Sequence, residues 1–273
     1  MNTNSNTYTV IYATILVVVV AAVLAFVSVS LSSRQNANVA TETRQSILSS
    51  VNLAKDADQA KNKNSYIDAE YNKYITDSYL VNVQGDKVEG DAFPMALASG
   101  LKSQYDIMKQ ANPDVSRLTL PVFVCTLDDG SRVEIFPLYG AGLWGPIWGY
   151  ISLKDDYSTI YGATFLHKGE TPGLGAEIAT AHFSGQFPGK TIFDGDNLVS
   201  VSIVKGGAPE GDIHGVDAIS GGTITSRSLE KAIRQWLEYY KPYLEKQLAA
   251  KAQAQAAAES TTNTVDNHEE GNL

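Results

Sequence analysis

The sequence predicts an α+β fold in which one N-terminal transmembrane helix precedes a soluble domain with a largely antiparallel sheet packed by helices. Residues 10–31 are apolar apart from scattered Thr, Ser and Tyr, as in a membrane-spanning helix. Between residues 117 and 204, short β-branched and aromatic runs alternate with turn sequences, as in an antiparallel sheet. Residues 229–244 repeat apolar side chains at helical spacing, which predicts a helix packed on that sheet.

Length, charge and cysteine usage exclude several functions. The chain has 273 residues, 44% of them hydrophobic, which is enough for one domain with appendages. A formal net charge of -9 and the lack of any Lys/Arg run argue against nucleic-acid binding. Cys125 is the only cysteine, so the chain forms no intrachain disulfide, and its strand-like neighbours predict a buried thiol. We predict no metal site and no catalytic residues in this chain.

The N-terminus predicts an uncleaved membrane anchor. No charged side chain occurs in residues 1–33. A helix over residues 10–31 would be about 33 Å long, enough to cross a hydrocarbon core of about 30 Å. The alternative is a cleaved signal peptide, which has a basic start and a shorter apolar core. Residues 1–7 contain no Lys or Arg, so we favour the anchor.

Four regions are expected along the chain. A short N-terminus and the anchor helix occupy residues 1–33. A polar helical connector at residues 34–94 leads into the soluble domain at residues 95–248, and a disordered C-terminal tail follows at residues 249–273. Ile47, Val51, Leu53 and Ala54 predict an amphipathic helix in the connector. The tail has no apolar periodicity, which favours disorder.

The elements of the soluble domain follow from periodicity and turn residues. Strands are expected at residues 76–83, 117–127, 131–138, 147–153, 158–166 and 198–204, with turns at residues 85–87, 128–130 and 154–156. A helix is expected at residues 176–183. The last helix should bury one face, made of Leu229, Ala232, Ile233, Trp236, Leu237, Tyr240, Tyr243 and Leu244. Thr225 or Ser226 is expected to cap its start.

The segment 217–226 places small residues and hydroxyls directly before this last helix. Free backbone N–H groups and the positive end of the helix dipole favour a phosphate there. Gly221 and Gly222 would let a bulky group approach the backbone. Thr223 is then a hydroxyl that could carry a phosphate-linked cofactor. Taken alone, the segment is more typical of a helix cap and a turn.

Two further glycine-rich segments stand out: the first favours close approach by a ligand or another backbone, and the second favours an aromatic ring. Residues 137–149 hold Trp144 and Trp148 among four glycines, but not with the spacing of a dinucleotide fingerprint, and a hairpin with core tryptophans is the alternative. The sequence Pro-Gly-Leu-Gly at residues 172–175 predicts a rigid loop that presents Leu174, which suits a flat ring.

Polar residues near these segments are less specific. Lys205, followed by two glycines at the end of a predicted strand, could offer a cation to a phosphate, although a plain turn is equally compatible. His167 and His182 have no acidic partners at ligand spacing, so we interpret both as structural or surface residues.

Together, the segments Gly140–Trp144, Glu170–Gly175 and Ser220–Thr223 make the chain resemble the FMN-binding domain family. Within it, the chain is similar to the C subunits of sodium-translocating NADH:quinone oxidoreductases and, more distantly, to the G subunits of Rnf electron-transport complexes. The resemblance covers the anchor, the connector and the domain at residues 95–248. It implies FMN joined by a phosphoester to the threonine that ends a Ser/Thr-Gly-Ala-Thr motif.

That threonine matches Thr223, and Gly222 stands where the motif has alanine. Thr225 is a second possible acceptor. By position, the resemblance puts Leu143 and Trp144 near the flavin. The residues expected to line the ring are Glu170, Thr171, Gly173, Leu174 and Gly175. Those expected around the phosphate are Ser220, Gly221 and Gly222, with Lys205 added from its own chemistry.

The resemblance also implies a role, partners and a location. The chain would be an electron-carrying component of a Na(+)-transporting NADH:ubiquinone reductase, relaying electrons from a neighbouring metal centre to the next flavin toward quinone, coupled to sodium export. Its partners would be the A, B, D, E and F subunits and, during maturation, a flavin transferase that uses FAD. The FMN domain would lie on the periplasmic side of the bacterial inner membrane. Arg34 and Arg44 weakly favour the opposite orientation, with Glu42 offsetting part of that charge.

Two alternatives remain open. The first is an Rnf-type G subunit, which would work with ferredoxin and NAD. The second is a membrane-anchored scaffold module without a cofactor, in which Thr223 only begins a helix.

Overall fold

A computed structural model describes residues 6–269 of the chain. It divides the chain into two compact units, with the boundary between Glu42 and Thr43. The first unit contains most of helix α1 (Asn6–Ser50), and the second contains every strand and the remaining helices of the described residues.

Helix α1 is the membrane-spanning candidate. Its apolar stretch has a mean hydropathy of 3.0, and within residues 6–269 it is the one helix long and apolar enough to cross a membrane. The large apolar side chains of residues 10–31 are exposed all around the helix, as lipid contact requires. No Gly or Pro interrupts residues 6–50, so Ile47 of the amphipathic helix expected in the connector lies in α1. The rest of that prediction is wrong, because α1 ends at Ser50 and Val51, Leu53 and Ala54 lie beyond it, where Asn52 and Ala54 adopt positive φ.

The sheet of the second unit has six antiparallel strands and confirms the predicted α+β class. The strands follow the order β2 (Lys87–Val88), β1 (Ile75–Val81), β3 (Leu120–Thr126), β4 (Arg132–Ala141), β5 (Pro146–Leu153) and β6 (Ile160–His167). Because β1 and β2 come from the segment 34–94, much of that segment belongs to the sheet-bearing unit.

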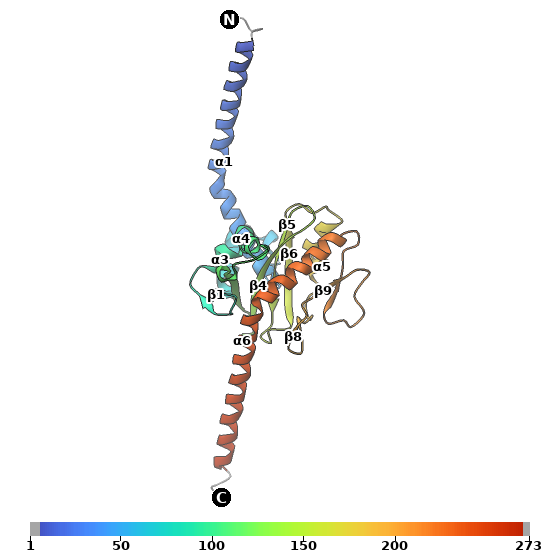
Figure 1. Cartoon of the computed structure of the whole chain (residues 1–273). Helices are drawn as coiled ribbons and strands as arrows, with labels where there is room; N and C mark the ends of the chain where they lie inside the picture. The colour runs from blue at the N-terminus through green and yellow to red at the C-terminus, as the bar shows by residue number, and fades with distance from the viewer. Residues whose placement is uncertain (1–5, 270–273) are drawn as a thin grey trace. The chain divides into compact units, whose positions relative to one another are not determined.

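Helices cover both faces of this sheet (Figure 1). Alternation along β3 separates the two cores: Val122 and Val124 join the core under the last helix, α6 (Thr223–Glu269), while Phe123 and Cys125 join the core with the end of α1. The Cys125 thiol is buried, as predicted, and burial raises its pKa to about 11. The shorter helical segments are η1 (Ala57–Gln59), α2 (Lys63–Tyr74), α3 (Ala92–Ala96), α4 (Ala98–Met108), η2 (Val115–Arg117), η3 (Gly175–Ala179) and α5 (Ala181–Ser184).

Two predicted elements are divided in the structure. The strand expected at 198–204 is wrong: β8 (Asn197–Leu198) pairs with β7 (Phe193–Asp194), and β9 (Ser202–Val204) pairs in parallel with β10 (Gly215–Asp217). Ser200, between them, has φ +65°, which no extended strand accommodates. The helix expected at 176–183 is two short segments, because Thr180 is extended and its Oγ1 accepts the Phe183 N–H at 3.3 Å.

Helix α6 (Thr223–Glu269) buries the predicted apolar face. The predicted cap is wrong, because the helix begins at Thr223 and leaves Thr225 and Ser226 in its first turn. Both hydroxyls have other roles: Thr225 donates to Glu170, and Ser226 accepts from the Ile219 N–H at 3.2 Å. The helix also extends to Glu269, where the sequence predicts a disordered tail from residue 249. The alanines of residues 249–258 explain helix formation there.

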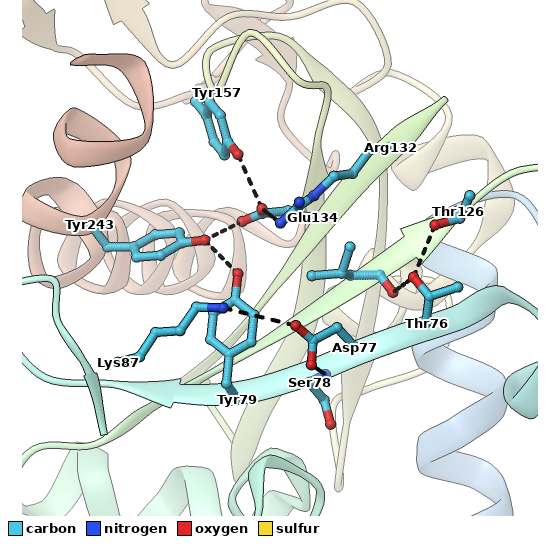
Figure 2. A network of polar contacts seen from close by, with 11 residues as sticks. Thr76, Asp77, Ser78, Tyr79, Lys87, Thr126, Arg132, Glu134, Tyr157 and Tyr243 are labelled. Atoms are coloured by element: carbon cyan, nitrogen blue, oxygen red, sulfur yellow. Dashed lines mark hydrogen bonds and ion pairs between the residues drawn. The ribbon is translucent and has the colours of Figure 1, made fainter. Parts of the chain in front are cut away.

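A buried carboxylate ties α6 to the sheet (Figure 2). Glu134 on β4 is 2% exposed. One of its oxygens accepts from Arg132 at 2.6 Å and Tyr157 at 3.1 Å, and the other accepts from the Tyr243 hydroxyl at 2.7 Å. The Tyr243 and Tyr79 hydroxyls are 2.6 Å apart. Three segments of the fold therefore meet at one carboxylate, and β1 joins them through the contact between Tyr79 and Tyr243.

This cluster predicts a loss of stability at high pH. Burial, reinforced by the charge of Glu134, raises the pKa of Tyr243 and of Tyr157 above that of a free phenol. A tyrosine whose pKa is raised in the folded state contributes its full stabilisation at pH values below its unfolded pKa of about 10. This stabilisation is lost as the pH rises from there toward the folded-state pKa. We expect urea unfolding of the full chain in detergent to show a fall in stability above about pH 10. In Tyr243→Phe the fall should be smaller, and equal slopes in the two proteins would contradict the assignment.

Candidate functional site

One cavity gathers most of the residues predicted for the site. Its volume is ≈ 460 Å³, within the usual range for ligand sites. Three segments build it: the β4–β5 hairpin loop, the loop after β6 and the first turn of α6. Its lining residues are Leu143, Trp144, Glu170, Thr171, Leu174, Gly175, Gly221, Gly222, Thr223, Ile224 and Thr225.

The hairpin loop presents two apolar side chains to this cavity. Strand β4 ends at Ala141, and the loop closes where the Gly142 N–H donates to the Gly145 carbonyl at 2.7 Å. Leu143 is 48% exposed and Trp144 is 69% exposed. The alternative of a core tryptophan is therefore wrong for Trp144.

The loop after β6 places Leu174 opposite the start of α6. The Leu174 N–H donates to the Thr171 carbonyl at 3.1 Å, and Gly173 adopts φ +73° between them. Leu174 is 42% exposed, and its Cδ2 lies 2.6 Å from where a Cβ on Gly221 would stand. Gly221 also has φ +73°, so its backbone conformation favours glycine there, and a Cβ would displace the Leu174 side chain.

The first turn of α6 separates the two threonines considered as acceptors. Thr223 is the first residue of the helix and is half-buried on the cavity wall. Thr225 is only 2% exposed, and its Oγ1 donates to Glu170 Oε2 at 2.6 Å. The Thr225 hydroxyl is therefore buried and engaged, whereas the Thr223 hydroxyl lies where N–H groups of the first turn lack intrahelical partners.

A second hollow of ≈ 430 Å³ borders the same turn, and it is lined by more polar residues. Lys205 and Ser220 lie there, together with Gly221 and Thr223, which both hollows share. The structure thus brings nine predicted residues into the first cavity and places Lys205 and Ser220 in the adjoining one. Gly173 lines neither.

Sequence reasoning missed Ile224. Its side chain is 56% exposed and lines the first cavity. The sequence did contain an indication, because Ile224 is an apolar residue in the first turn of the helix that does not belong to the apolar face beginning at Leu229. The two histidines agree with their expected roles, since His167 Nδ1 accepts the Glu170 N–H at 3.2 Å and His182 lies exposed on α5.

Gly222→Ala should destabilise the protein, although alanine is the residue expected from the motif. A Cβ on Gly222 would lie 2.8 Å from Ile219 Cγ2 and 3.1 Å from Ile219 Cβ. We expect the free energy of unfolding to fall by about 1 kcal/mol because of this overpacking. Ile219→Leu lacks the Cγ2 methyl, so the double variant should recover part of the loss in urea unfolding of the full chain. If the free-energy changes of the two single substitutions simply add in the double variant, this contact is contradicted.

Comparison with known proteins places the chain in a family. The family model of the FMN-binding domain matches residues 142–238, which include every lining residue of the first cavity. A crystal structure of the C subunit of Na(+)-translocating NADH-quinone reductase from Parabacteroides distasonis is 41% identical, with a TM-score of 0.65. The match covers 78% of this chain and 96% of that one. The chain belongs to the C-subunit family of Na(+)-translocating NADH-quinone reductases.

Other members of the C-subunit family agree. The crystal structure of Shewanella oneidensis NqrC is 28% identical, with a TM-score of 0.62, and the match covers 78% of this chain and 99% of that one. The C subunit from Vibrio anguillarum is 29% identical over 216 residues, which are 77% of this chain and 82% of the relative. The C subunit from Haemophilus ducreyi is 27% identical over 253 residues, 90% of this chain and 95% of the relative.

Membership of the C-subunit family confirms the predicted enzyme class, a component of an oxidoreductase complex, and the predicted FMN-binding domain. Together with the apolar helix α1, it also indicates that the chain is anchored in a membrane.

Proposed function

We propose that this chain holds FMN covalently on Thr223 and relays electrons within the membrane complex of its family. The observation that carries this proposal is the cavity itself, which joins Thr223 at a helix start to exposed apolar side chains from two other loops.

The residues present fit FMN in both of its parts. Exposed Leu143, Trp144 and Leu174 offer apolar and aromatic contacts to a flat ring, and burying them would remove apolar surface from water. The phosphate would lie at the start of α6, where backbone N–H groups and the helix dipole favour an anion. Gly221 and Gly222 leave the space that a Cβ would fill.

FMN, when bound, supplies the one-electron chemistry, and this chain's residues bind, orient and tune it. A covalent tether suits this chain for two reasons. The cavity opens among exposed side chains, and the net charge of -9 opposes the retention of a free anion. Thr223 is therefore an attachment residue rather than a catalytic one.

The relay would run from a neighbouring metal centre to the next flavin and on to quinone, coupled to sodium export by the assembly. The A, B, D, E and F subunits are the proposed partners, and a flavin transferase attaches FMN from FAD. Residues 95–248 hold the whole proposed site, with 34–94 as connector and start of the domain and 249–273 as a tail. No observation favours an Rnf-type G subunit.

We place the FMN domain on the periplasmic side of the bacterial inner membrane, with α1 as the single span. Alkaline phosphatase fused to the C-terminus tests this orientation, because that enzyme is active only after export. High phosphatase activity in intact cells is the expected result. An inactive fusion, with full activity in a control carrying a cleaved export signal, would place the domain in the cytoplasm.

Covalent attachment is tested by producing the full chain with and without a flavin transferase. We expect a band that fluoresces after denaturing electrophoresis, and an intact mass increased by one FMN phosphoester, only with the transferase. A dark band, while the same transferase labels another substrate, would instead support a scaffold without a cofactor.

A further inference from the structure

Glu170 has a position in the cavity wall that the attachment of FMN does not explain. Its side chain is 4% exposed, and both carboxylate oxygens accept hydrogen bonds. Oε1 accepts from the Trp144 N–H at 2.9 Å, and Oε2 accepts from Thr225 Oγ1 at 2.6 Å. One carboxylate therefore joins the hairpin loop to the first turn of α6.

Two glycines leave just enough space for this carboxylate. A Cβ on Gly142 would stand 2.5 Å from Oε1, and a Cβ on Gly175 would stand 2.5 Å from both Oε2 and Thr225 Oγ1. A side chain at either position would displace the carboxylate from its two donors. Glycine at positions 142 and 175 thus leaves the space that the Glu170 carboxylate occupies.

The charge of Glu170 has no cationic partner among residues 6–269: no Lys or Arg forms an ion pair with it there. Both of its hydrogen bonds are made with neutral groups, the Trp144 N–H and the Thr225 hydroxyl. As a carboxylate, Glu170 places a negative charge at the wall of a cavity that is largely lined by apolar residues and glycine.

We propose that Glu170 is a positioning residue that also sets the reduction potential of the flavin, holding it low. Reduction adds negative charge to the flavin, and a nearby like charge in a poorly solvated site opposes that step. The two hydrogen bonds keep the charge in place and keep the Trp144 loop against α6. This inference rests on the proposed function, since it concerns the flavin held on Thr223.

Glu170→Gln tests the charge with little change of shape. The glutamine carbonyl can accept from the Trp144 N–H, and its amide can donate to Thr225 Oγ1 after the hydroxyl rotates. In the flavin-loaded full chain we expect unchanged flavin loading and a higher midpoint potential. A tenfold stabilisation of the reduced flavin corresponds to about 59 mV for a one-electron couple.

Two controls separate charge from packing. Glu177→Gln removes an equal charge from the same loop, where Glu177 accepts the Gly173 N–H at 3.0 Å but does not line the cavity, so its potential should stay near that of the unaltered chain. Thr225→Val keeps the carboxylate and removes one donor, so its potential should fall or stay constant. Both Thr225→Val and Glu170→Gln disturb the bond between these two side chains, but only Glu170→Gln removes the charge. If Glu170 acted only by holding the structure together, the two variants would shift the flavin potential in the same direction.

The results distinguish a failure of the role of Glu170 from a failure of FMN attachment. A loaded Glu170→Gln protein with an unchanged potential would overturn this inference and leave the proposed function standing. If Glu170→Gln fails to fold, as thermal unfolding of the flavin-free chain would show, a raised potential in Thr225→Val would overturn the inference instead. An unaltered chain that never carries flavin would overturn the proposed function and this inference with it.

Discussion

Thr223→Val is expected to abolish covalent flavin completely. Valine keeps the shape of threonine but has no hydroxyl, so no phosphoester can form at the first position of α6. The measurement is in-gel fluorescence of the denatured full chain after co-expression with a flavin transferase. Because valine retains the branched shape at an incompletely buried position, the fold should persist, and thermal unfolding of the flavin-free chain checks this.

Thr225→Val is the matched control for this experiment. It removes an equal hydroxyl two residues away, one that is buried and donates to Glu170. We expect the Thr225 variant to retain fluorescence, and Thr223→Ser, which restores a hydroxyl, to recover part of it. Fluorescence that survives in Thr223→Val and disappears in Thr225→Val would move the attachment to Thr225.

The second large effect concerns stability. Glu134→Ala should lower the free energy of unfolding by about 3 kcal/mol. The substitution leaves the buried Tyr157 and Tyr243 hydroxyls without their carboxylate acceptor and opens a space beneath α6. Arg132 adds little to the loss, because its side chain is 50% exposed and water can solvate it. Urea unfolding of the full chain in detergent measures the difference.

Glu134→Gln distinguishes lost hydrogen bonds from lost charge. A glutamine keeps the volume and one acceptor oxygen, so we expect it to be less destabilising than alanine. A loss in Glu134→Ala of well under about 1 kcal/mol would mean that the tyrosines find other partners and that this cluster does not hold α6 to the sheet.

The errors in the sequence-based predictions share one physical origin. The period-2 pattern of 198–204 is genuine, but Ser200 adopts φ +65° and divides the strand. Thr225 and Ser226 have the composition of helix caps, yet their hydroxyls bond to Glu170 and the Ile219 N–H. In each case a contact or a backbone conformation set by the surrounding structure overrides a local preference.

The sequence was sufficient to predict those elements that one repeat period, or the composition of one segment, defines. Hydropathy alone identified the apolar stretch of α1 that is long enough to span a membrane, and helical spacing alone identified the buried face of α6. Most of the cavity's residues, by contrast, were expected from the resemblance to the FMN-binding domain family and not from any period. Residues near one another in sequence share the same element, so their pattern carries this information directly.

Only the tertiary structure decided which of these residues meet. Glu170 contacts Trp144 and Thr225 across separations of 26 and 55 residues, and Glu134 contacts Tyr243 across 109. No periodicity records such pairs, because they depend on how the loops and α6 pack on the sheet. The motif already favours Thr223 over Thr225 as the proposed acceptor, and the structure adds a physical reason for it, because packing buries the Thr225 hydroxyl against Glu170.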